Sequence, residues 1–285
     1  MFLGFFLLLL SYVATKLILA PLGSLLVRSG MMKKNYRGNP APTALGLVFL
    51  LTMPLSYACL ILAGSTLNPT EIYLFLFFVV AMGLSGLCDD LLKTDEEKGF
   101  RGHFAQLLKG NLTSGGLKAI TGLVFALIFT VGLARTVGSS CLDWLLVFPQ
   151  TVMVALAANS VNLFDLRPGR ALKFIFFVVL ALALFILLFT PGEKSDYAFF
   201  LFPVTGGVLA YWPTDLKARG MMGDTGANFL GALLGAIILL IRDSLLFWIS
   251  LISLILLQLW AEKYSLSQVI ENNGVLRFLD RLGRD

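Results

Sequence analysis

Long apolar runs separated by short polar stretches dominate this chain. A bilayer crossing needs about 20 predominantly apolar residues, and nine runs reach or approach that length. They cover residues 1–27, 44–63, 73–92, 117–133, 144–163, 172–190, 197–212, 227–240 and 245–260. Pro54 and Gly-rich stretches blur several ends. The pattern predicts an all-α, polytopic integral membrane protein with about nine to ten transmembrane helices.

Composition agrees with this fold class. Of the 285 residues, 58% are hydrophobic and 14% charged, and the mean hydropathy is +0.86. Soluble domains are nearer half apolar and a quarter charged, so a disordered chain and an ordinary cytosolic enzyme are excluded. We expect one transmembrane domain over residues 1–285, with a cytoplasmic tail from residue 262. Within the tail, residues 269–279 have the pattern of a short interfacial amphipathic helix.

The distribution of cations predicts the orientation. Of the 22 Lys and Arg residues, eighteen fall in one set of alternating loops, three in the other, and Lys16 lies inside the first run. Because cytoplasmic loops carry the excess of Lys and Arg, we expect the N-terminus outside, the tail inside and an odd number of crossings. Topology and anionic substrates thus account for the net charge of +5, and no nucleic-acid partner is expected.

Four carboxylates stand at the expected cytoplasmic helix ends: Asp89, Asp90, Asp165 and Asp224. A charge within the bilayer costs at least about 2.5–3.5 kcal/mol, so such acids have either a chemical role or a simpler one as helix caps and solvated loop charges. Adjacent aspartates repel each other unless a cation neutralises them. Oxygen ligands without nearby His or Cys suit Mg²⁺ or Mn²⁺, completed by phosphate oxygens. Lys93 is spaced to pair with Asp89 or with a phosphate.

Two segments add polar groups at the same expected depth in the membrane as these carboxylates. Glycines on both sides of Asp224 allow backbone N–H groups to approach an anion at a helix N-terminus. Asn159 and Asn162 share a helical face directed toward Asp165. Buried amides at this depth either bond neighbouring helices or bind substrate, and the sequence leaves both interpretations open.

Three segments in combination resemble the polyprenyl-phosphate N-acetylhexosamine-1-phosphate transferases, a superfamily of the glycosyltransferase family 4 type. They are DDLLK at 89–93, NSVNLFD at 159–165 and MGDTG at 222–226, with a looser likeness in GNPAPT at 38–43. The segments occur in the family's order, and the similarity runs through most of the chain. Each segment alone is a weak signal, whereas the combination is specific.

The resemblance implies Mg²⁺-dependent transfer of a sugar 1-phosphate from a nucleotide-sugar, UDP-linked, to undecaprenyl or another polyprenyl phosphate, with release of UMP. It places this reaction at the cytoplasmic face of a bacterial plasma membrane, in cell-wall or surface-glycan synthesis, and raises a homodimer as a family-level expectation. The implied catalytic residues are Asp89, Asp90 and Asp165, the implied metal ligands are Asp224 and Asp89, and the implied substrate-binding residues include Lys93, Asn159 and Asn162.

The chain departs from the family's pattern in its donor-recognition motifs. A His-rich motif near the last helices is missing, Pro168 replaces a second aspartate, and Met221 stands where an aromatic residue often stacks on uracil. His103, the only histidine, and the loop cations Arg167 and Arg170 are candidates for phosphate binding, although topology alone also explains loop cations. Two alternatives stay open: the same mechanism with a non-UDP donor, and a catalytically silent scaffold that binds polyprenyl phosphate. A transporter is disfavoured because neither internal repeats nor broken mid-membrane helices are evident.

Overall fold

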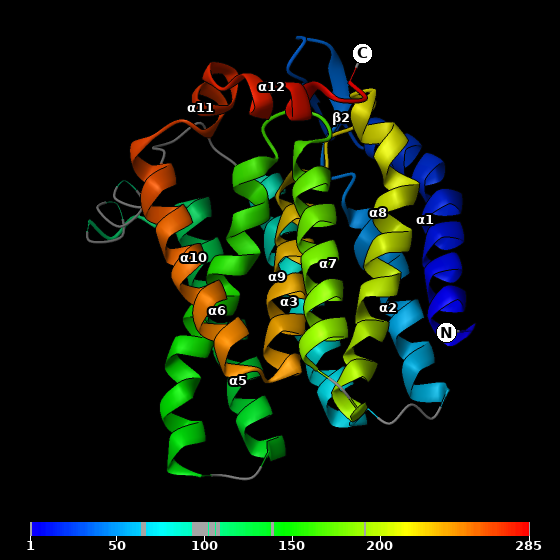
Figure 1. Cartoon of the computed structure of the whole chain (residues 1–285). Helices are drawn as coiled ribbons and strands as arrows, with labels where there is room; N and C mark the ends of the chain where they lie inside the picture. Colours follow the sequence, from blue (N-terminus) through cyan, green and yellow to red (C-terminus); the bar gives the residue numbers. More distant parts are fainter. Residues whose placement is uncertain are drawn as a thin grey trace.

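The computed structural model describes residues 2–63, 67–92, 102, 106, 109–137, 140–190 and 192–284. Within this part of the chain, every one of the predicted apolar runs forms a helix (Figure 1). These helices are α1 (Phe2–Arg28), α2 (Leu47–Leu62), α3 (Pro69–Leu92), α5 (Ser114–Val137), α6 (Cys141–Phe164), α7 (Arg170–Phe189), α8 (Leu201–Leu216), α9 (Gly223–Ile241) and α10 (Ser244–Lys263). The prediction of an all-α polytopic membrane protein is confirmed.

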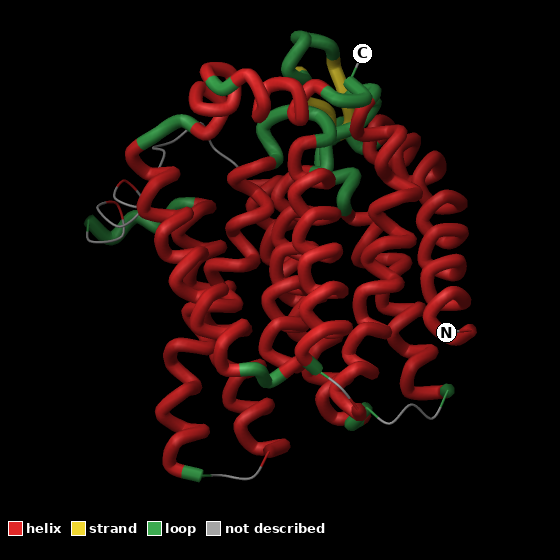
Figure 2. The backbone as a smooth tube through the Cα atoms, viewed as in Figure 1, coloured by secondary structure: helices red, strands yellow, loops and turns green. Residues whose placement is uncertain are grey.

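Seven of these helices are long and apolar enough to cross a membrane. The two shorter ones, α2 and α8, have 16 residues each, which gives a rise of about 24 Å against a hydrocarbon core of about 30 Å. The 3₁₀ helix η1 (Gly192–Phe200) leads directly into α8 and lengthens it. Helices account for nearly all the regular structure, and the strands of the described residues form a single small hairpin (Figure 2).

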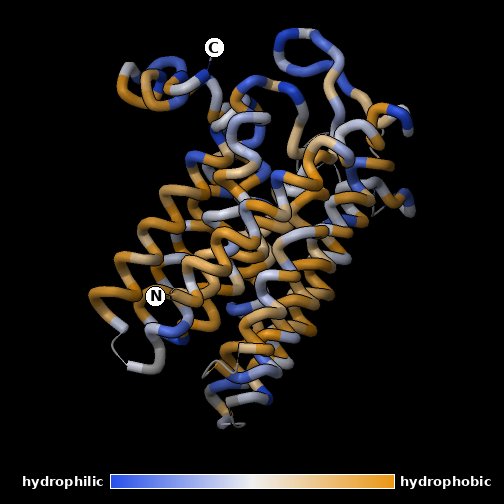
Figure 3. Tube along the Cα trace, turned by 90° about the vertical axis from the view of Figure 1, so that its right-hand side faces the viewer, coloured by the Kyte–Doolittle hydropathy of each residue, from blue (hydrophilic) through white to orange (hydrophobic). Residues whose placement is uncertain are grey.

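One end of the bundle gathers the polar connections. The hairpin of β1 (Met32–Lys34) and β2 (Pro40–Pro42) lies there with α11 (Leu266–Asn272) and α12 (Gly274–Arg281), opposite the N-terminus (Figure 1). Apolar residues fill the middle of the bundle and hydrophilic ones concentrate at its ends (Figure 3). We call the end with the hairpin and the tail helices the polar end.

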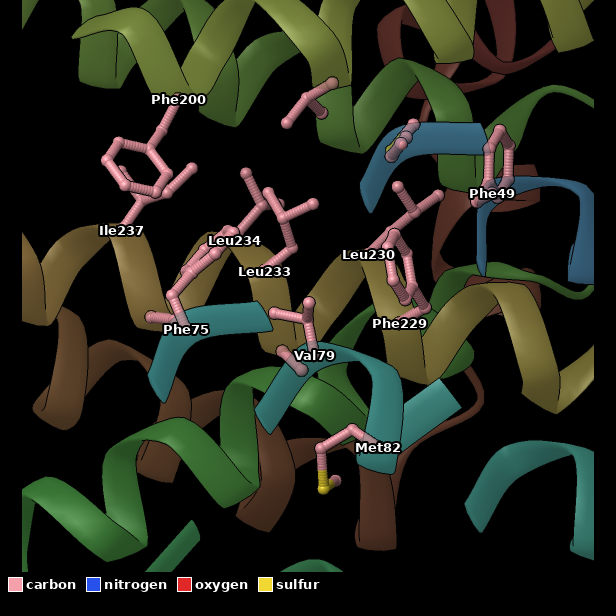
Figure 4. Close-up of a cluster of buried hydrophobic side chains, with 14 of the residues drawn as sticks. Phe49, Phe75, Val79, Met82, Phe200, Phe229, Leu230, Leu233, Leu234 and Ile237 are labelled. Carbon is pink, nitrogen blue, oxygen red and sulfur yellow. The ribbon is translucent and has the colours of Figure 1, made fainter. Parts of the chain in front are cut away.

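Helix α9 is the centre of the bundle. Every residue from Asp224 to Ile241 is buried, as expected of a helix that is apolar all round. Helices α3 and α6 pack against it, and in Figure 4 Phe75 and Val79 of α3 lie beside Leu233 of α9. Small residues allow this close packing, because a Cβ at Gly231 would lie 2.7 Å from the carbonyl oxygen of Ala158. The N-terminus of α9 is thereby fixed among neighbouring helix ends.

The amphipathic tail segment is two helices rather than the single one expected. The chain turns at Asn273, whose side chain accepts hydrogen bonds from the backbone N–H groups of Val275 and Leu276, both at 3.1 Å. This cap satisfies donors that a new helix leaves without partners. The tail therefore folds as α11 followed by α12.

Candidate active site

The end of α3 is bound to the start of α9 through Asp90. Its carboxylate accepts hydrogen bonds from the backbone N–H groups of Asp224 (3.1 Å) and Thr225 (2.9 Å), and from the Thr225 hydroxyl (2.7 Å). The first N–H groups of a helix have no partner within it, and the helix dipole favours a negative charge there. The anion that the glycine-flanked motif was expected to attract is thus, in this structure, a carboxylate of the protein itself.

Two glycines make this approach of α3 and α9 sterically feasible. A Cβ at Gly86 would contact the carbonyl group of Asp224, with its carbon only 2.6 Å away. Gly223 has a φ of +72°, a conformation that side chains rarely adopt, and a Cβ there would lie 2.6 Å from the Asp90 carboxylate. Both positions therefore require glycine for the helix ends to meet as they do.

A lysine from a third helix completes a carboxylate–lysine triad, which we define as Asp89, Lys118 and Asp224. The Lys118 ammonium lies 2.6 Å from Asp224 Oδ1 and 3.8 Å from Asp89 Oδ2. All three side chains are at most 13% exposed. Charge pairs screened from water in this way interact more strongly than surface pairs. The triad joins α3, α5 and α9 at the polar end.

Two more aspartates belong to this region: Asp165 lies near Asp224 of the triad, and Asp215 lies near Asp165. Asp165, which ends α6, is half-buried, and its carboxyl faces the Gly223 amide. Burial raises the pKa of Asp165 well above its usual range, and the charges of Asp215 and Asp224 raise it further. Asp215, at the end of α8, is buried and accepts a hydrogen bond from the Gly169 N–H at 2.6 Å. Asp165 therefore holds a proton to a higher pH than an exposed aspartate does.

A groove of about 450 Å³ leads away from the triad between α3 and α5. Asp89 and Lys118 line one part of it, while Phe77, Leu84 and Phe125 line the apolar part. This combination of a charged head and an apolar stem suits a ligand with a phosphate at one end and a hydrocarbon chain at the other.

The chemistry of the triad is compatible with a divalent metal that arrives with phosphate. Among the residues that the structure describes, no group of three or more His, Cys, Asp or Glu side chains could hold a metal. Mg²⁺, however, is usually bound through one or two carboxylates together with substrate phosphates and water. Asp89 and Asp224 provide such a pair, and the ammonium of Lys118 beside both shows that their field favours a cation.

The two predicted asparagines have different surroundings. Asn159 donates a hydrogen bond through Nδ2 to Gln258 Oε1 of α10 at 3.1 Å, and so it joins two helices. Of the two uses of a buried amide that the sequence left open, the structure thus provides the interhelical one for Asn159. Asn162 lies in the last turn of α6, partly exposed and three residues before Asp165.

The predicted loop cations are engaged near the tail and the hairpin. Arg170 is buried and donates to Asp280 Oδ1 (2.8 Å) and to Ser267 Oγ (2.9 Å). Arg167 lies over the ring of Tyr36 in the hairpin, 5.4 Å from its centroid. These guanidinium groups hold the tail and hairpin onto the α6–α7 loop. Lys93 and His103 lie outside the described residues.

Sequence reasoning missed two residues of this region, Lys118 and Asp215. Lys118 was counted only as a cation of a cytoplasmic loop. Asp215 carries the signal that singled out Asp89 and Asp165, an acid at the end of an apolar run, and that rule would have found it.

The fold and the site define a multi-pass membrane protein with a carboxylate–lysine cluster at the head of an apolar groove. The model of glycosyl transferase family 4 matches residues 72–242, the segment that contains the triad, Asp90, Asp165 and Asp215. The chain belongs to this family.

Named relatives point to the same family. The chain is 29% identical over 235 residues to phospho-N-acetylmuramoyl-pentapeptide-transferase from Acetivibrio thermocellus, covering 77% of this chain and 65% of the relative. It is 27% identical over 225 residues to the protein of the same name from Shouchella clausii, covering 77% and 67%. The chain thus spans about two thirds of the length of these relatives.

Proposed function

We propose that this protein transfers a sugar 1-phosphate, of N-acetylhexosamine type, from a UDP-linked sugar to a polyprenyl phosphate at the cytoplasmic face of a bacterial membrane. The observation that carries the proposal is the convergence of Asp89, Lys118 and Asp224 at the head of the groove between α3 and α5. Family membership and the names of the relatives support it. The pathway would be cell-wall or surface-glycan synthesis.

The proposed reaction joins two phosphates. A phosphate oxygen of the acceptor lipid attacks the phosphorus that bears the sugar, a new P–O–P bond forms, and the bond to the bridging oxygen of the nucleotide breaks. UMP leaves with that oxygen. Such reactions depend mainly on positioning and on neutralising phosphate charge. Atoms and charge balance without an additional co-reactant.

The described residues divide these tasks. Asp89 faces the groove and would orient the acceptor phosphate or remove its proton. Lys118 would neutralise phosphate charge, and Asp165, with its raised pKa, would complete the polar site. Asp90 would position Asp224 through the hydrogen bonds at the start of α9. Asp224 and Asp89 would hold Mg²⁺, which when bound supplies charge neutralisation at the diphosphate.

The proposed orientation rests on the loops. The hairpin, the tail helices and the ends of α3 and α6 lie at the polar end, opposite the N-terminus (Figure 1). These segments carry the basic residues that the positive-inside rule assigns to the cytoplasm. A water-soluble nucleotide-sugar would then reach the triad from the cytoplasm, while the lipid acceptor would enter from the membrane.

Turnover by the purified chain tests this function. The protein is reconstituted with Mg²⁺, undecaprenyl phosphate and a panel of nucleotide-sugars, and release of nucleoside monophosphate is measured. We expect UMP release, and at least a 100-fold lower rate in Asp224→Asn, because the triad loses a charge that pairs with Lys118. Asp243→Asn is the matched control, since Asp243 caps α10 and asparagine caps equally well.

Each other outcome contradicts a stated part of the proposal. Release of a different nucleoside monophosphate would show that the donor is not UDP-linked. Absence of turnover with every donor, with polyprenyl phosphate still bound, would favour a silent scaffold. Equal turnover in Asp224→Asn and Asp243→Asn would show that the triad has no role in the reaction.

A further inference from the structure

A second groove, of about 620 Å³, lies on the other side of the bundle, between α1 and the loop that joins α8 to α9. Leu19, Ala20 and Val27 of α1 form part of its apolar wall. No residue lines both this groove and the one beside the triad. The second groove is therefore a separate site.

Three cations face the second groove: Lys16, Arg28 and Arg219. No Asp or Glu is among its lining residues. Within the described part of the chain, their side chains form no ion pair and no hydrogen bond. The groove thus presents positive charge that the described residues leave uncompensated.

Lys16 is the unusual member of this set. Apart from Arg28 at its end, it is the only charged residue of α1, and about 18 Å of helix separates the two at 1.5 Å per residue. Lys16 therefore lies deep within the span, where an ionisable residue is costly and indicates a functional partner. The residues of α1 that line the groove fall at positions 16, 19–20, 23–24 and 27–28, about one helical turn apart, so they share one face of α1.

We propose that the second groove binds an anionic glycerophospholipid. The lipid phosphate lies between Arg28 and Arg219 at the polar end, and an acyl chain follows Leu19, Ala20 and Val27. The flexible Lys16 side chain extends along the groove toward the ester oxygens below the phosphate. Basic pockets between helices at the cytoplasmic membrane surface are typical sites for anionic lipid headgroups.

The surroundings of the groove favour a membrane lipid over a soluble anion. Its wall is more apolar than polar, and the neighbouring α1 side chains Leu17 (68% exposed) and Leu25 (51% exposed) point outward, where they meet lipid. The groove contains no carboxylate that could act on a phosphate, unlike the groove beside Asp89. Its role is therefore binding, independent of the transfer reaction proposed above.

Lipid binding to the full chain tests this site. Detergent-purified protein is titrated with phosphatidylglycerol, phosphatidylcholine or undecaprenyl phosphate, and bound lipid is counted by native mass spectrometry. We expect phosphatidylglycerol to bind at least tenfold more tightly than phosphatidylcholine. Lys16→Met and Arg219→Gln each reduce that preference about tenfold, whereas Lys217→Gln, in the same loop but outside the groove, leaves it unchanged.

Three results would overturn the proposal. They are equal binding of the two glycerophospholipids, an unchanged preference in both groove variants, and displacement of phosphatidylglycerol from this groove by undecaprenyl phosphate at equal concentration. Because Arg219 is exposed in a loop, Arg219→Gln remains informative even if Lys16→Met does not fold. Thermal unfolding of each variant identifies that case.

Discussion

Replacing Gly86 by alanine tests how closely α3 and α9 must approach for the carboxylate cluster to form. The new Cβ would lie 2.6 Å from the Asp224 carbonyl carbon, whereas ordinary contact begins at 3.4 Å. The two helices must therefore part by about 0.8 Å, because backbone atoms cannot move aside as a side chain does. The bond from the Thr225 N–H to Asp90, now 2.9 Å, would lengthen to about 3.7 Å and be lost.

The cost of this separation follows from its parts. Overpacking costs about 1–3 kcal/mol, and a weakened hydrogen bond to a charged group costs about 1.5–3 kcal/mol. Alanine stabilises the folded helix by about 1 kcal/mol relative to glycine, because its helix propensity is higher. We expect Gly86→Ala to lower the free energy of unfolding by about 3 kcal/mol. Turnover should fall about 100-fold, because a displacement near 1 Å at reacting groups has that effect.

Gly122→Ala is the matched control for Gly86→Ala. It makes the same change inside α5, but its Cβ would meet only the mobile end of Met82, with Cε at 3.2 Å. The assays are thermal unfolding in detergent and release of nucleoside monophosphate. If Gly86→Ala matched Gly122→Ala in both, close contact of α3 and α9 would not be needed for the site.

Three further predictions concern the charged groups. Lys118→Met should lower turnover at least 100-fold, with partial recovery in Lys118→Arg, because phosphate charge loses its neutralising cation. It should also lower the Tm, because the screened carboxylates of Asp89 and Asp224 lose their cation; equal turnover in Lys118→Met and wild type would exclude the proposed role. Asp280→Asn should lower the free energy of unfolding by about 3 kcal/mol at pH 7, because the buried Arg170 loses its carboxylate partner. Glu271→Gln is the control and should lower it little, because Glu271 lies 4.0 Å from Arg167 at the surface. Burial alone would raise the pKa of Asp280, but hydrogen bonds from Arg170 and Arg284 lower it below its usual range. The Tm difference between wild type and Asp280→Asn should therefore be largest above pH 4 and should shrink as the pH falls further. A Tm difference independent of pH would contradict this reasoning. Removal of divalent ions with a chelator should abolish turnover and leave the Tm unchanged, because the carboxylates hold metal only together with phosphate; a large fall in Tm would indicate a resident structural ion.

The helices were predictable because a run of about 20 apolar residues is by itself the pattern of a helix that spans a bilayer. Every predicted run overlaps a helix of the structure. The hairpin of β1 and β2 was not expected in the loop after α1, since strands of three residues leave no periodic pattern. The break at Asn273 was missed because hydrophobic pattern describes a face of a helix and not its cap.

The acids of the candidate site could be predicted from the sequence, whereas the side chains that contact them could not. An acid at the end of an apolar run is visible in a single sequence, so Asp89, Asp90, Asp165 and Asp224 could be proposed from it. The contact of Lys118 with two of them depends on how α5 packs against α3 and α9, which no local pattern specifies. Likewise, the sequence treated Asp89 and Asp90 alike, whereas the structure turns Asp90 to the start of α9 and Asp89 toward the groove.

The position of the cluster at helix ends follows from the two phases that the proposed reaction must join. A nucleotide-sugar is charged and stays in water, while a polyprenyl chain stays in the bilayer, so their phosphates can meet only near the interface. Helix ends meet this requirement, because a helix N-terminus carries partial positive charge and N–H groups that hold carboxylates, as the start of α9 holds Asp90. In this chain α9 places that end between α3, α5 and α6, and Gly86 and Gly223 remove the side chains that would keep the backbones apart. The buried apolar length of α9 then anchors the cluster in the bundle, so that the charges are held by packing rather than by a flexible loop.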